Sequence, residues 1–445
     1  MKKMSRRSRE VMLLILALGC FAILGFVSQM TAPLSQNFDK AFVNSDFHAM
    51  DLRPQLYALL SIMTIPAALM SRYLGARACM LMGTCLFAGG ALSTLPAAQV
   101  GSIGPLAIGI SIVYTGLAFI DTASMTIMAT YGERQKSYGR MLVGKTSEMA
   151  GWAIGFAVTI FSIERRTIAP PLETGSISES LYLLAAQRAD LMAAATPFVW
   201  VGSVAGVIAL VTALQETNDS TPDPPHKYKL KEIVRSISRD KVFILGAVAL
   251  VVYIMTQVFC WHSIVTVSTA VELNSAPDVP TSKATEYAQN MILLTLLFFC
   301  LGRIVVIPYA YRNKINPQRL LAWASGVSAV LTFLSIFVPR EVGMWFIIVA
   351  TTSMSLIFPT IVEIATRHMD RETVVIAMPI AVISNFGGLL AWVVNKWFDA
   401  DSPVKMIITT IALGGIAAYA IWLKKNMRKP APNDDFFKTH SDDEP

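Results

Sequence analysis

The sequence is poor in charged residues. Only 15% of its 445 residues are Asp, Glu, Lys or Arg and 54% are hydrophobic, whereas soluble domains carry roughly a quarter charged residues. Polar stretches are scarce as well, and the most polar internal one covers only 215–241. No segment is left that would fold into a soluble catalytic or nucleotide-binding domain. We therefore expect a protein that is not an enzyme and that uses no cofactor, nucleotide or nucleic acid.

The cysteine pattern is equally sparse. The chain has five cysteines, and none belongs to a C-x-x-C pair. All of them fall inside apolar stretches: Cys20, Cys79, Cys85, Cys260 and Cys300. Cysteines in such surroundings behave as small buried apolar residues, so we expect neither a metal site nor a disulfide framework.

Apolar runs of about 20 residues are abundant, and each is long enough to cross a hydrocarbon core of roughly 30 Å. We recognise twelve such spans, at about 11–33, 54–75, 77–98, 104–130, 141–163, 192–214, 242–266, 288–310, 319–338, 342–366, 372–396 and 403–424. The first follows the basic segment MKKMSRRSRE and has no small-residue cleavage site, so we expect an uncleaved helix rather than a signal peptide. The sequence therefore predicts an all-α membrane protein with twelve transmembrane helices.

Basic residues are distributed unevenly between the two sides of these spans. We assign the segments that connect the spans alternately to the two sides of the membrane. Of the 37 Lys and Arg residues, 26 then lie on the same side as the N-terminus and nine on the opposite side; the other two, Lys145 and Arg303, lie inside spans. Cytoplasmic loops of membrane proteins are enriched in Lys and Arg, which explains the net charge of +7 without a nucleic-acid partner. We expect both termini in the cytoplasm and the protein in a bacterial inner membrane.

The polar segment in the middle of the chain separates six spans from six more. We predict an N-terminal half at 1–214, a cytoplasmic central loop at 215–241, a C-terminal half at 242–424 and a disordered cytoplasmic tail at 425–445. Within the loop, 228–238 is expected to form a short amphipathic helix at the membrane surface. Transporters are often built from two such halves, with the substrate site between them at the bilayer midplane.

One stretch matches the sequence pattern of a nucleotide-binding motif. Residues 139–146 read G-x-x-x-x-G-K-T, the pattern of a phosphate-binding P-loop. A P-loop needs a buried strand before it and a soluble βαβ unit around it, but polar residues precede Gly139 and an apolar run follows. We interpret the stretch as a basic loop that enters the fifth span. Within that span, Gly151 and Gly155 form a G-x-x-x-G motif that allows close helix packing.

Three charged residues fall inside the fourth and fifth spans. Asp121 lies about ten residues before the end of the fourth span that is predicted to face the cytoplasm. At a rise of 1.5 Å per residue, this places it roughly 15 Å deep in the membrane. Glu148 lies at a similar depth, and Lys145 is three positions before it on the same helix face. Charges at membrane depth face the bundle interior and a partner, so we expect one polar cluster.

The cluster has two interpretations. As a proton relay, Asp121 and Glu148 would gain and lose protons as access alternates. As a static ion pair, the charges would only hold the helices together, and Lys145 fits this role of counter-ion better than that of a carrier. Two acids and one base leave one acid uncompensated, which favours the relay.

Two further charged residues lie in the C-terminal half. Arg303 in the eighth span and Glu363 in the tenth are candidates for a structural ion pair, since both are shallow enough to extend toward water.

The remaining candidates are polar residues inside spans. Gln257 and Trp261 are separated by four positions and share a helix face, which suits a sugar-like ligand, although Trp also anchors helices at the membrane interface. The neighbouring His262 is either a proton carrier or a neutral hydrogen-bonded side chain. We add three candidates for substrate binding in other spans: Ser28, Gln29 and Asn385.

Six stretches carry a resemblance to a known family: FVSQMTAPLSQNF, GLAFIDTASM, GRMLVGKTSEMAG, TQVFCWHS, LGRIVVIP and SMSLIFPTI. Through them the chain resembles the major facilitator superfamily and, within it, the fucose–proton symporter branch. In that branch the acid of the fourth span is implicated in sugar binding and proton coupling, and Asp121 stands at its place. The branch's Q-x-x-x-W-S pattern is matched by Gln257 and Trp261, with His262 in place of the serine.

The chain departs from the family pattern at two places. An Asn-Asp pair in the first span of the fucose symporter, whose Asp is the proposed proton carrier, corresponds to Ser28 and Gln29, which do not titrate. In the fifth span, Glu148 stands where the family often has Asn. The resemblance therefore implies that proton coupling involves Asp121 and Glu148.

Taken together, these features predict the major facilitator fold and proton-coupled uptake of a small polar solute, sugar-like, by rocking of the two halves. The substrate site is expected between the first, fourth, seventh and tenth spans. A proton-driven efflux antiporter for drugs or metabolites is the alternative, and a transporter-like receptor without transport is a third class. The expected partners are the solute, protons and the lipid bilayer, and the expected state is a monomer.

Overall fold

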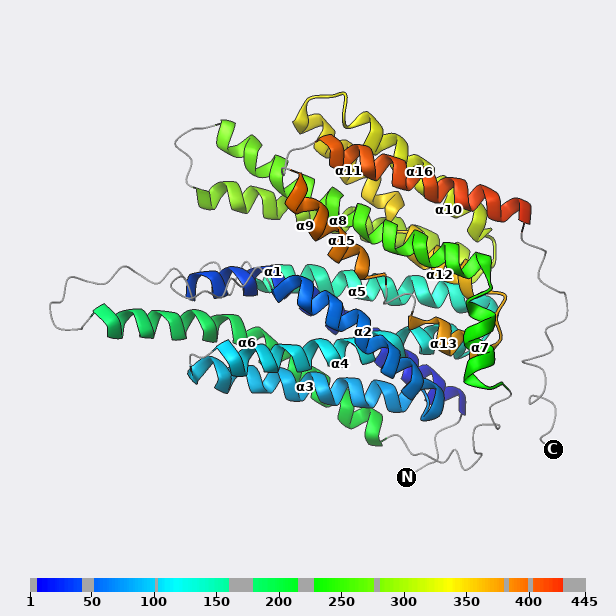
Figure 1. The fold of residues 1–445 in the computed structure, drawn as a ribbon, viewed down its shortest axis with the longest axis horizontal. Helices are drawn as coiled ribbons and strands as arrows, with labels where there is room; N and C mark the ends of the chain where they lie inside the picture. Colours follow the sequence, from blue (N-terminus) through cyan, green and yellow to red (C-terminus); the bar gives the residue numbers. More distant parts are fainter. Residues whose placement is uncertain are drawn as a thin grey trace.

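The computed structural model describes residues 6–41, 52–100, 103–159, 179–214, 228–275, 281–379, 384–398 and 403–426. Within these ranges all regular secondary structure is helical. The long helices run close to the long axis of the molecule in Figure 1. The all-α prediction is thus confirmed for the described part of the chain.

The first six predicted spans correspond to six helices. These are α1 (Arg6–Ala41), α2 (Leu52–Tyr73), α3 (Ala76–Val100), α4 (Ile103–Thr130), α5 (Ser137–Thr159) and α6 (Glu179–Leu214). A short 3-10 helix, η2 (Arg134–Lys136), lies between α4 and α5.

The last six spans correspond to six further crossings. They are formed by α8 (Lys241–Ser275), α9 (Thr281–Tyr311), α10 (Pro317–Leu334), α11 (Arg340–Met354) with α12 (Ile357–Thr366), α13 (Arg371–Ala377) with α15 (Phe386–Trp397), and α16 (Pro403–Asn426). By length and composition alone, nine helices or helix pairs of the described part qualify as membrane spans. The other three predicted crossings are α5, α10 and the interrupted pair α13 and α15.

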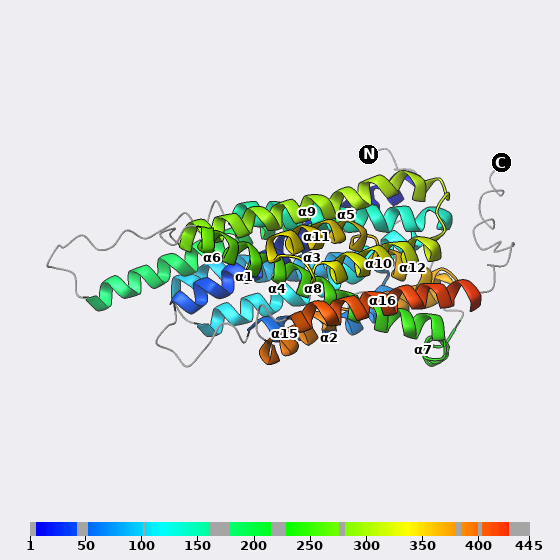
Figure 2. The ribbon, with the colours of Figure 1, turned by 90° about the horizontal axis from the view of Figure 1, so that it is seen from above.

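Helix contacts divide the molecule into two bundles. In the first bundle α3 packs against α4 and α6, and α1 packs against α5; in the second, α8 packs against α9, and α10 packs against α16. Figure 1 shows the bundles side by side, and the view from above in Figure 2 shows α5 beside α9 and α2 beside α15 where the bundles meet. The boundaries of the halves stay a prediction, because 215–227 and 427–445 lie outside the described residues.

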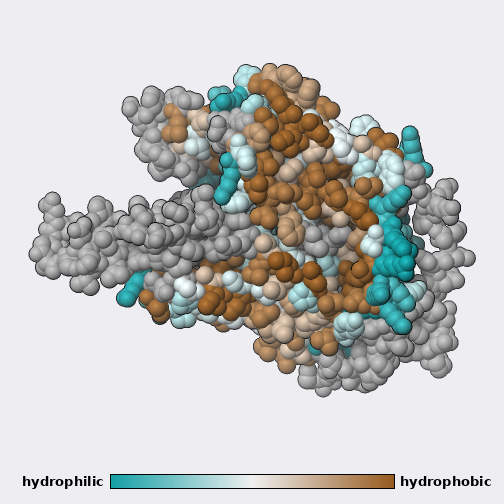
Figure 3. All heavy atoms as spheres, in the orientation of Figure 1, coloured by the Kyte–Doolittle hydropathy of each residue, from teal (hydrophilic) through white to brown (hydrophobic). Residues whose placement is uncertain are grey.

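The surface has the pattern expected of a membrane protein. Large apolar side chains such as Trp323 of α10, Val207 of α6 and Ile411 of α16 are exposed on the outside of the bundles. In Figure 3 apolar residues cover the middle of the visible face, and hydrophilic residues gather at one end. An apolar belt of this kind is stable in lipid and not in water.

The hydrophilic end is where α1 begins and α16 ends (Figure 1), and we call it the basic end. The short helix α7 (Leu230–Ile237) lies there, as predicted for 228–238, and buries only Ile233. Side chains tie several loops together at this end: Arg72 donates to the carbonyl of Tyr228, and His368 pairs with Asp240. Three of the segments counted as basic in the sequence, around residues 72, 228–240 and 368, therefore lie together.

Two crossings that the sequence predicts as single helices are interrupted. The tenth breaks at Ser355 and Leu356, between α11 and α12. Pro359 lacks the N–H that would bond to the carbonyl four residues earlier, so the Ser355 carbonyl is free to accept another donor. In the eleventh crossing α13 ends at Ala377, two residues before Pro379, and α15 begins at Phe386; 380–383 lie outside the described residues. Broken helices at membrane depth are tolerated where the freed groups face protein or a cavity.

The predicted G-x-x-x-G packing is confirmed between α1 and α5. A Cβ atom at Gly151 would collide with the carbonyl of Ala22, and one at Gly155 would lie 2.6 Å from the carbonyl of Phe26. The reciprocal contact involves Gly25, where a Cβ would collide with the carbonyl of Glu148. This close approach fixes the depth and orientation of the charged face of α5.

Gly151→Val should therefore prevent the native packing of α1 on α5. The added atoms meet backbone, which yields less than a side chain does, so we expect a loss of at least about 3 kcal/mol and a strongly reduced yield of folded protein. The measurement is the monodisperse fraction in detergent, with thermal unfolding of what is recovered. Gly89→Val on α3 is the matched control, because no atom lies within 4 Å of its Cβ position. Equal behaviour of the two variants would contradict the packing argument.

Candidate functional site

A cavity of about 740 Å³ lies between the two bundles. This volume is in the range of small-molecule binding sites. Eight helices contribute to its lining: α1, α2, α4, α5, α8, α9, α12 and α15. We expected the site to lie between the first, fourth, seventh and tenth spans. The second, fifth, eighth and eleventh crossings contribute lining residues as well. The reason is that α2 and α5 pack against the other bundle and so border the same space.

Every residue that the sequence singled out for substrate binding lines this cavity. From the first bundle these are Ser28, Gln29 and Asp121, and from the second Gln257, Trp261, His262 and Asn385. Lys145 and Glu148 line it as well. Their roles in binding stay predictions, but the helices bring all of them to one space.

The predicted charged cluster is present at the α5 face of the cavity. Lys145 Nζ lies 2.6 Å from Glu148 Oε2 and 3.5 Å from Asp121 Oδ1. Lys145 and Asp121 are only 6% and 5% exposed. The spacing of three residues on α5 brings Lys145 and Glu148 together, and the packing of α4 against α5 adds Asp121.

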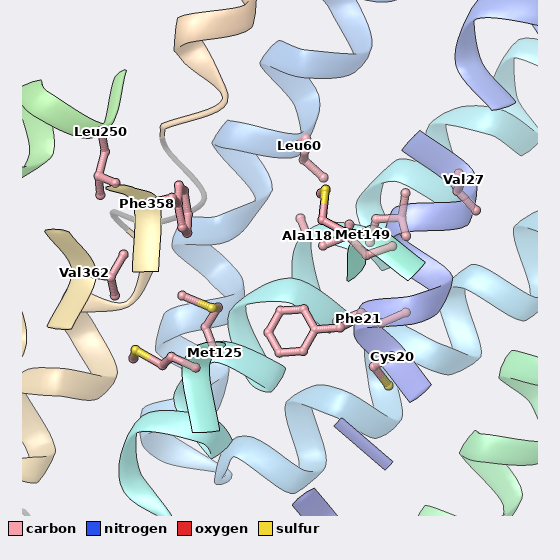
Figure 4. Close-up of a cluster of buried hydrophobic side chains, with 14 of the residues drawn as sticks. Cys20, Phe21, Val27, Leu60, Ala118, Met125, Met149, Leu250, Phe358 and Val362 are labelled. Atoms are coloured by element: carbon pink, nitrogen blue, oxygen red, sulfur yellow. The ribbon is translucent and has the colours of Figure 1, made fainter. Parts of the chain in front are cut away.

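Two aromatic rings flank the lysine. Its Nζ lies 5.0 Å from the ring centre of Phe21 on α1 and 4.9 Å from that of Phe358 on α12. At these distances the ring faces attract a cation. Figure 4 shows Phe21 and Phe358 among the buried apolar side chains. The ammonium group is therefore held between the bundles by two carboxylates and two rings.

The predicted ion pair between Arg303 and Glu363 is wrong for this structure. Arg303 Nε donates to the carbonyl of Ser355 at 2.8 Å, and its Nη1 donates to the carbonyl of Lys145. Glu363 instead accepts a hydrogen bond of 2.8 Å from the hydroxyl of Ser137. The Ser355 carbonyl, which has no N–H partner at Pro359, accepts the hydrogen bond from the Arg303 guanidinium.

Arg303 also does not extend toward water. It is 3% exposed, lies 4.7 Å from the ring centre of Phe299 and lines the cavity. The contact with the Lys145 carbonyl joins α9 of the second bundle to α5 of the first. Arg303 is therefore a fourth charged member of the site, which the sequence had placed outside it.

Aromatic side chains from both bundles meet in the cavity wall. The rings of Trp152 on α5 and Trp261 on α8 are 4.8 Å apart in an edge-on arrangement, and Trp261 is 5.9 Å from Phe299. The indole nitrogen of Trp261 is buried and has no hydrogen-bond partner. A buried donor of this kind costs free energy unless a ligand or water accepts from it.

The sequence interpretation missed Trp152. The sequence did contain an indication of its position: Trp152 follows Glu148 by four residues, so both lie on one face of α5. Five more polar lining residues were also missed: Tyr57, Tyr114, Thr269, Gln289 and Ser384. These residues carry no charge, and charge inside a span was the feature that singled out Asp121, Lys145 and Glu148.

Contacts between the bundles lie on the side of the cavity toward the basic end. Arg134 donates to the carbonyls of Arg367 and Met369. One turn deeper, the hydroxyls of Tyr138 and Thr360 are 2.8 Å apart. Together with the Ser137–Glu363 bond described above, they hold the bundles together between the cavity and the basic end in this conformation.

Comparison with known proteins gives the same overall picture. No protein-family model matches the chain. It is 23% identical over 382 residues to an L-fucose-proton symporter of Haemophilus influenzae, covering 84% of this chain and 86% of that protein. It is 22% identical over 408 residues to the L-fucose-proton symporter of Escherichia coli, covering 90% of each. A glucose/galactose transporter of Brucella abortus is 21% identical over 359 residues, or 79% of each chain.

Solved structures agree on the fold. The major facilitator superfamily transporter FucP, in the outward conformation, superposes with a TM-score of 0.76 at 20% identity, covering 93% of this chain and 99% of the other. The proton:xylose symporter XylE, bound to 6-bromo-6-deoxy-D-glucose, has a TM-score of 0.61 at 13% identity over 95% and 97% of the chains. The protein therefore has the fold of the major facilitator superfamily, and along most of its length it resembles the fucose–proton symporters.

Proposed function

We propose that the protein takes up a small sugar-like solute together with protons by alternating access. The observation that carries the proposal is the buried cluster of Asp121, Lys145 and Glu148 on a cavity between two bundles. Intramembrane acids that border a cavity are the usual carriers of coupled protons. The names of the relatives, which are fucose-proton symporters, support a sugar as the solute.

The arrangement provides a physical route to coupling. Both carboxylates contact the same lysine, so one of them can take up a proton while the other keeps its salt bridge. The cluster belongs to the first bundle but lies against Phe358 and Arg303 of the second. Rocking of the bundles separates these groups and changes the environment of the carboxylates. Proton binding and access to the solute are then linked through the same interface.

The expected orientation places the basic end in the cytoplasm, following the distribution of Lys and Arg. Because the bundles are joined on that side of the cavity, the conformation described above would then be closed toward the cytoplasm. The bacterial inner membrane as location and the monomeric state remain predictions.

The direct test is uptake into proteoliposomes with an inward pH gradient. We expect labelled L-fucose, D-glucose or D-galactose, or a close analogue, to accumulate above its external concentration, and a protonophore to abolish the accumulation. Empty liposomes provide the background. A failure of all sugar analogues, combined with proton-driven export of drugs or metabolites, would instead establish the efflux antiporter. Binding without flux would indicate a receptor.

Trp261 is expected to contribute both a ring face and a hydrogen bond to the solute. Trp261→Phe keeps the ring but removes the indole N–H, so KM should rise about 3- to 10-fold, the effect of one hydrogen bond of roughly 1 kcal/mol. Trp261→Ala should raise KM further, because it also removes the stacking surface. Initial rates of uptake measure both effects. Trp323→Phe, on the outer surface of α10, is the matched control and should leave KM unchanged; an unchanged KM in Trp261→Phe would exclude the proposed hydrogen bond.

A further inference from the structure

The charged side chains that line the cavity are balanced in number. Two are acidic, Asp121 and Glu148, and two are basic, Lys145 and Arg303; all other described lining residues are apolar or polar without a fixed charge, including His262. The four charges lie close together, since Lys145 pairs with both acids and Arg303 bonds to the carbonyl of Lys145. With both carboxyls ionised, the site carries no net charge.

Arg303 has more hydrogen-bond donors than its two carbonyl partners use. A guanidinium has five N–H donors, and the two carbonyls of Ser355 and Lys145 each accept one. The Phe299 ring packs against one face of the group without accepting an in-plane hydrogen bond. The remaining donors belong to a side chain that lines the cavity. Guanidinium donors at a buried site bind carboxylates more strongly than neutral acceptors.

Binding of a proton disturbs the balance. If one carboxyl takes up a proton, the site has one negative and two positive charges. A net charge on side chains as buried as Asp121, Lys145 and Arg303 is unfavourable. A neutral sugar leaves this excess in place, whereas a solute with one negative charge removes it. An anionic solute and a proton would thus cross together without net charge movement.

We propose that the solute is a sugar acid, that is, a polyhydroxylated monocarboxylate such as a hexuronate or an aldonate. Its carboxylate would bind Arg303, and its hydroxyls would bind polar lining residues such as Gln257, Asn385 and the unpartnered indole N–H of Trp261. A cavity of about 740 Å³ accommodates a solute of this size. The proposal rests on the proposed function and specifies its substrate class.

The test compares acidic and neutral sugars that differ only in the carboxylate. D-Glucuronate and D-glucose form one pair, D-galacturonate and D-galactose a second; D-gluconate and L-fucose complete the panel. Under an inward pH gradient we expect at least one acid to enter about 10-fold faster or more than its neutral counterpart, the effect of a charged hydrogen bond worth roughly 1.5 kcal/mol or more. Uptake of that acid should be insensitive to a membrane potential imposed with valinomycin and potassium.

Variants of Arg303 identify the group that binds the carboxylate. Arg303→Lys keeps the charge but loses the planar pair of donors, and the KM for the acid should rise about 10-fold, whereas any residual uptake of the neutral sugar should keep its KM. Lys136→Gln removes an exposed positive charge at the basic end and should change neither value. If Arg303→Lys fails to fold, competition of the acids against each other in wild-type protein still measures the preference.

The possible outcomes are distinct. Accumulation of a neutral sugar, with no transport of and no competition by any acid, would overturn the sugar-acid proposal and leave proton-coupled sugar uptake standing. Potential-driven entry of the acid would also overturn it, since the charges would not balance. Absence of uptake for both classes would contradict the proposed function itself.

Discussion

Replacing Asp121 by asparagine should abolish accumulation driven by a pH gradient and spare exchange of labelled for unlabelled solute at equal pH. The amide has the shape of the carboxyl but carries no proton to the other side. Asp121 is buried, borders the cavity and lies 3.5 Å from Lys145. We expect the ratio of internal to external solute under the gradient to fall to about one, because uncoupled transport only equilibrates the solute.

The matched control is Asp240→Asn at the basic end, where the acid pairs with His368 away from the cavity. This variant should accumulate solute to the wild-type level. Glu148→Gln tests whether the second acid shares the role, since both acids contact the same lysine. Full accumulation by Asp121→Asn, combined with its loss in Glu148→Gln, would move the coupled proton to Glu148. Full accumulation by both variants would disprove the relay.

Replacing Lys145 by methionine should strongly destabilise the folded protein. Methionine fills much of the volume between Phe21 and Phe358 but leaves two buried carboxylates without their cation. Breaking a buried ion pair in this way costs about 3–5 kcal/mol. Thermal unfolding in detergent at alkaline pH measures the loss. The loss should shrink at acidic pH, because protonated carboxyls need no counter-ion.

The double variant Lys145→Met/Glu148→Gln provides the internal check. Removal of one carboxylate together with the lysine should recover a large part of the lost stability, since only Asp121 then remains charged and Arg303 lies nearby. Lys136→Met, which breaks an exposed pair with Glu133, should change stability by no more than about 1 kcal/mol. If Lys145→Met unfolds at the wild-type temperature, Lys145 is not the counter-ion of the acids.

The sequence by itself determined the fold class and most of the membership of the site. Spans of apolar residues specify helices because lipid offers no partner for backbone groups, and all twelve predicted spans have a helical counterpart. The proximity of Asp121, Lys145 and Glu148 also followed from sequence, because their separations along α4 and α5 fix depth and face. The close contact at Gly151 followed in the same way from a local motif.

Only the tertiary structure decided the partners of residues that are distant along the chain. Arg303 and Glu363 have opposite charges and similar depths, yet Arg303 binds the Ser355 carbonyl at the helix break and the Lys145 carbonyl of α5. Glu363 binds Ser137 of the other bundle. The meeting of Trp152 with Trp261 likewise depends on how α5 lies beside α8. Periodicity fixes which face of a helix a residue occupies, whereas the packing of the bundles decides what that face meets. The charge balance of the cavity is therefore a property of the assembled helices.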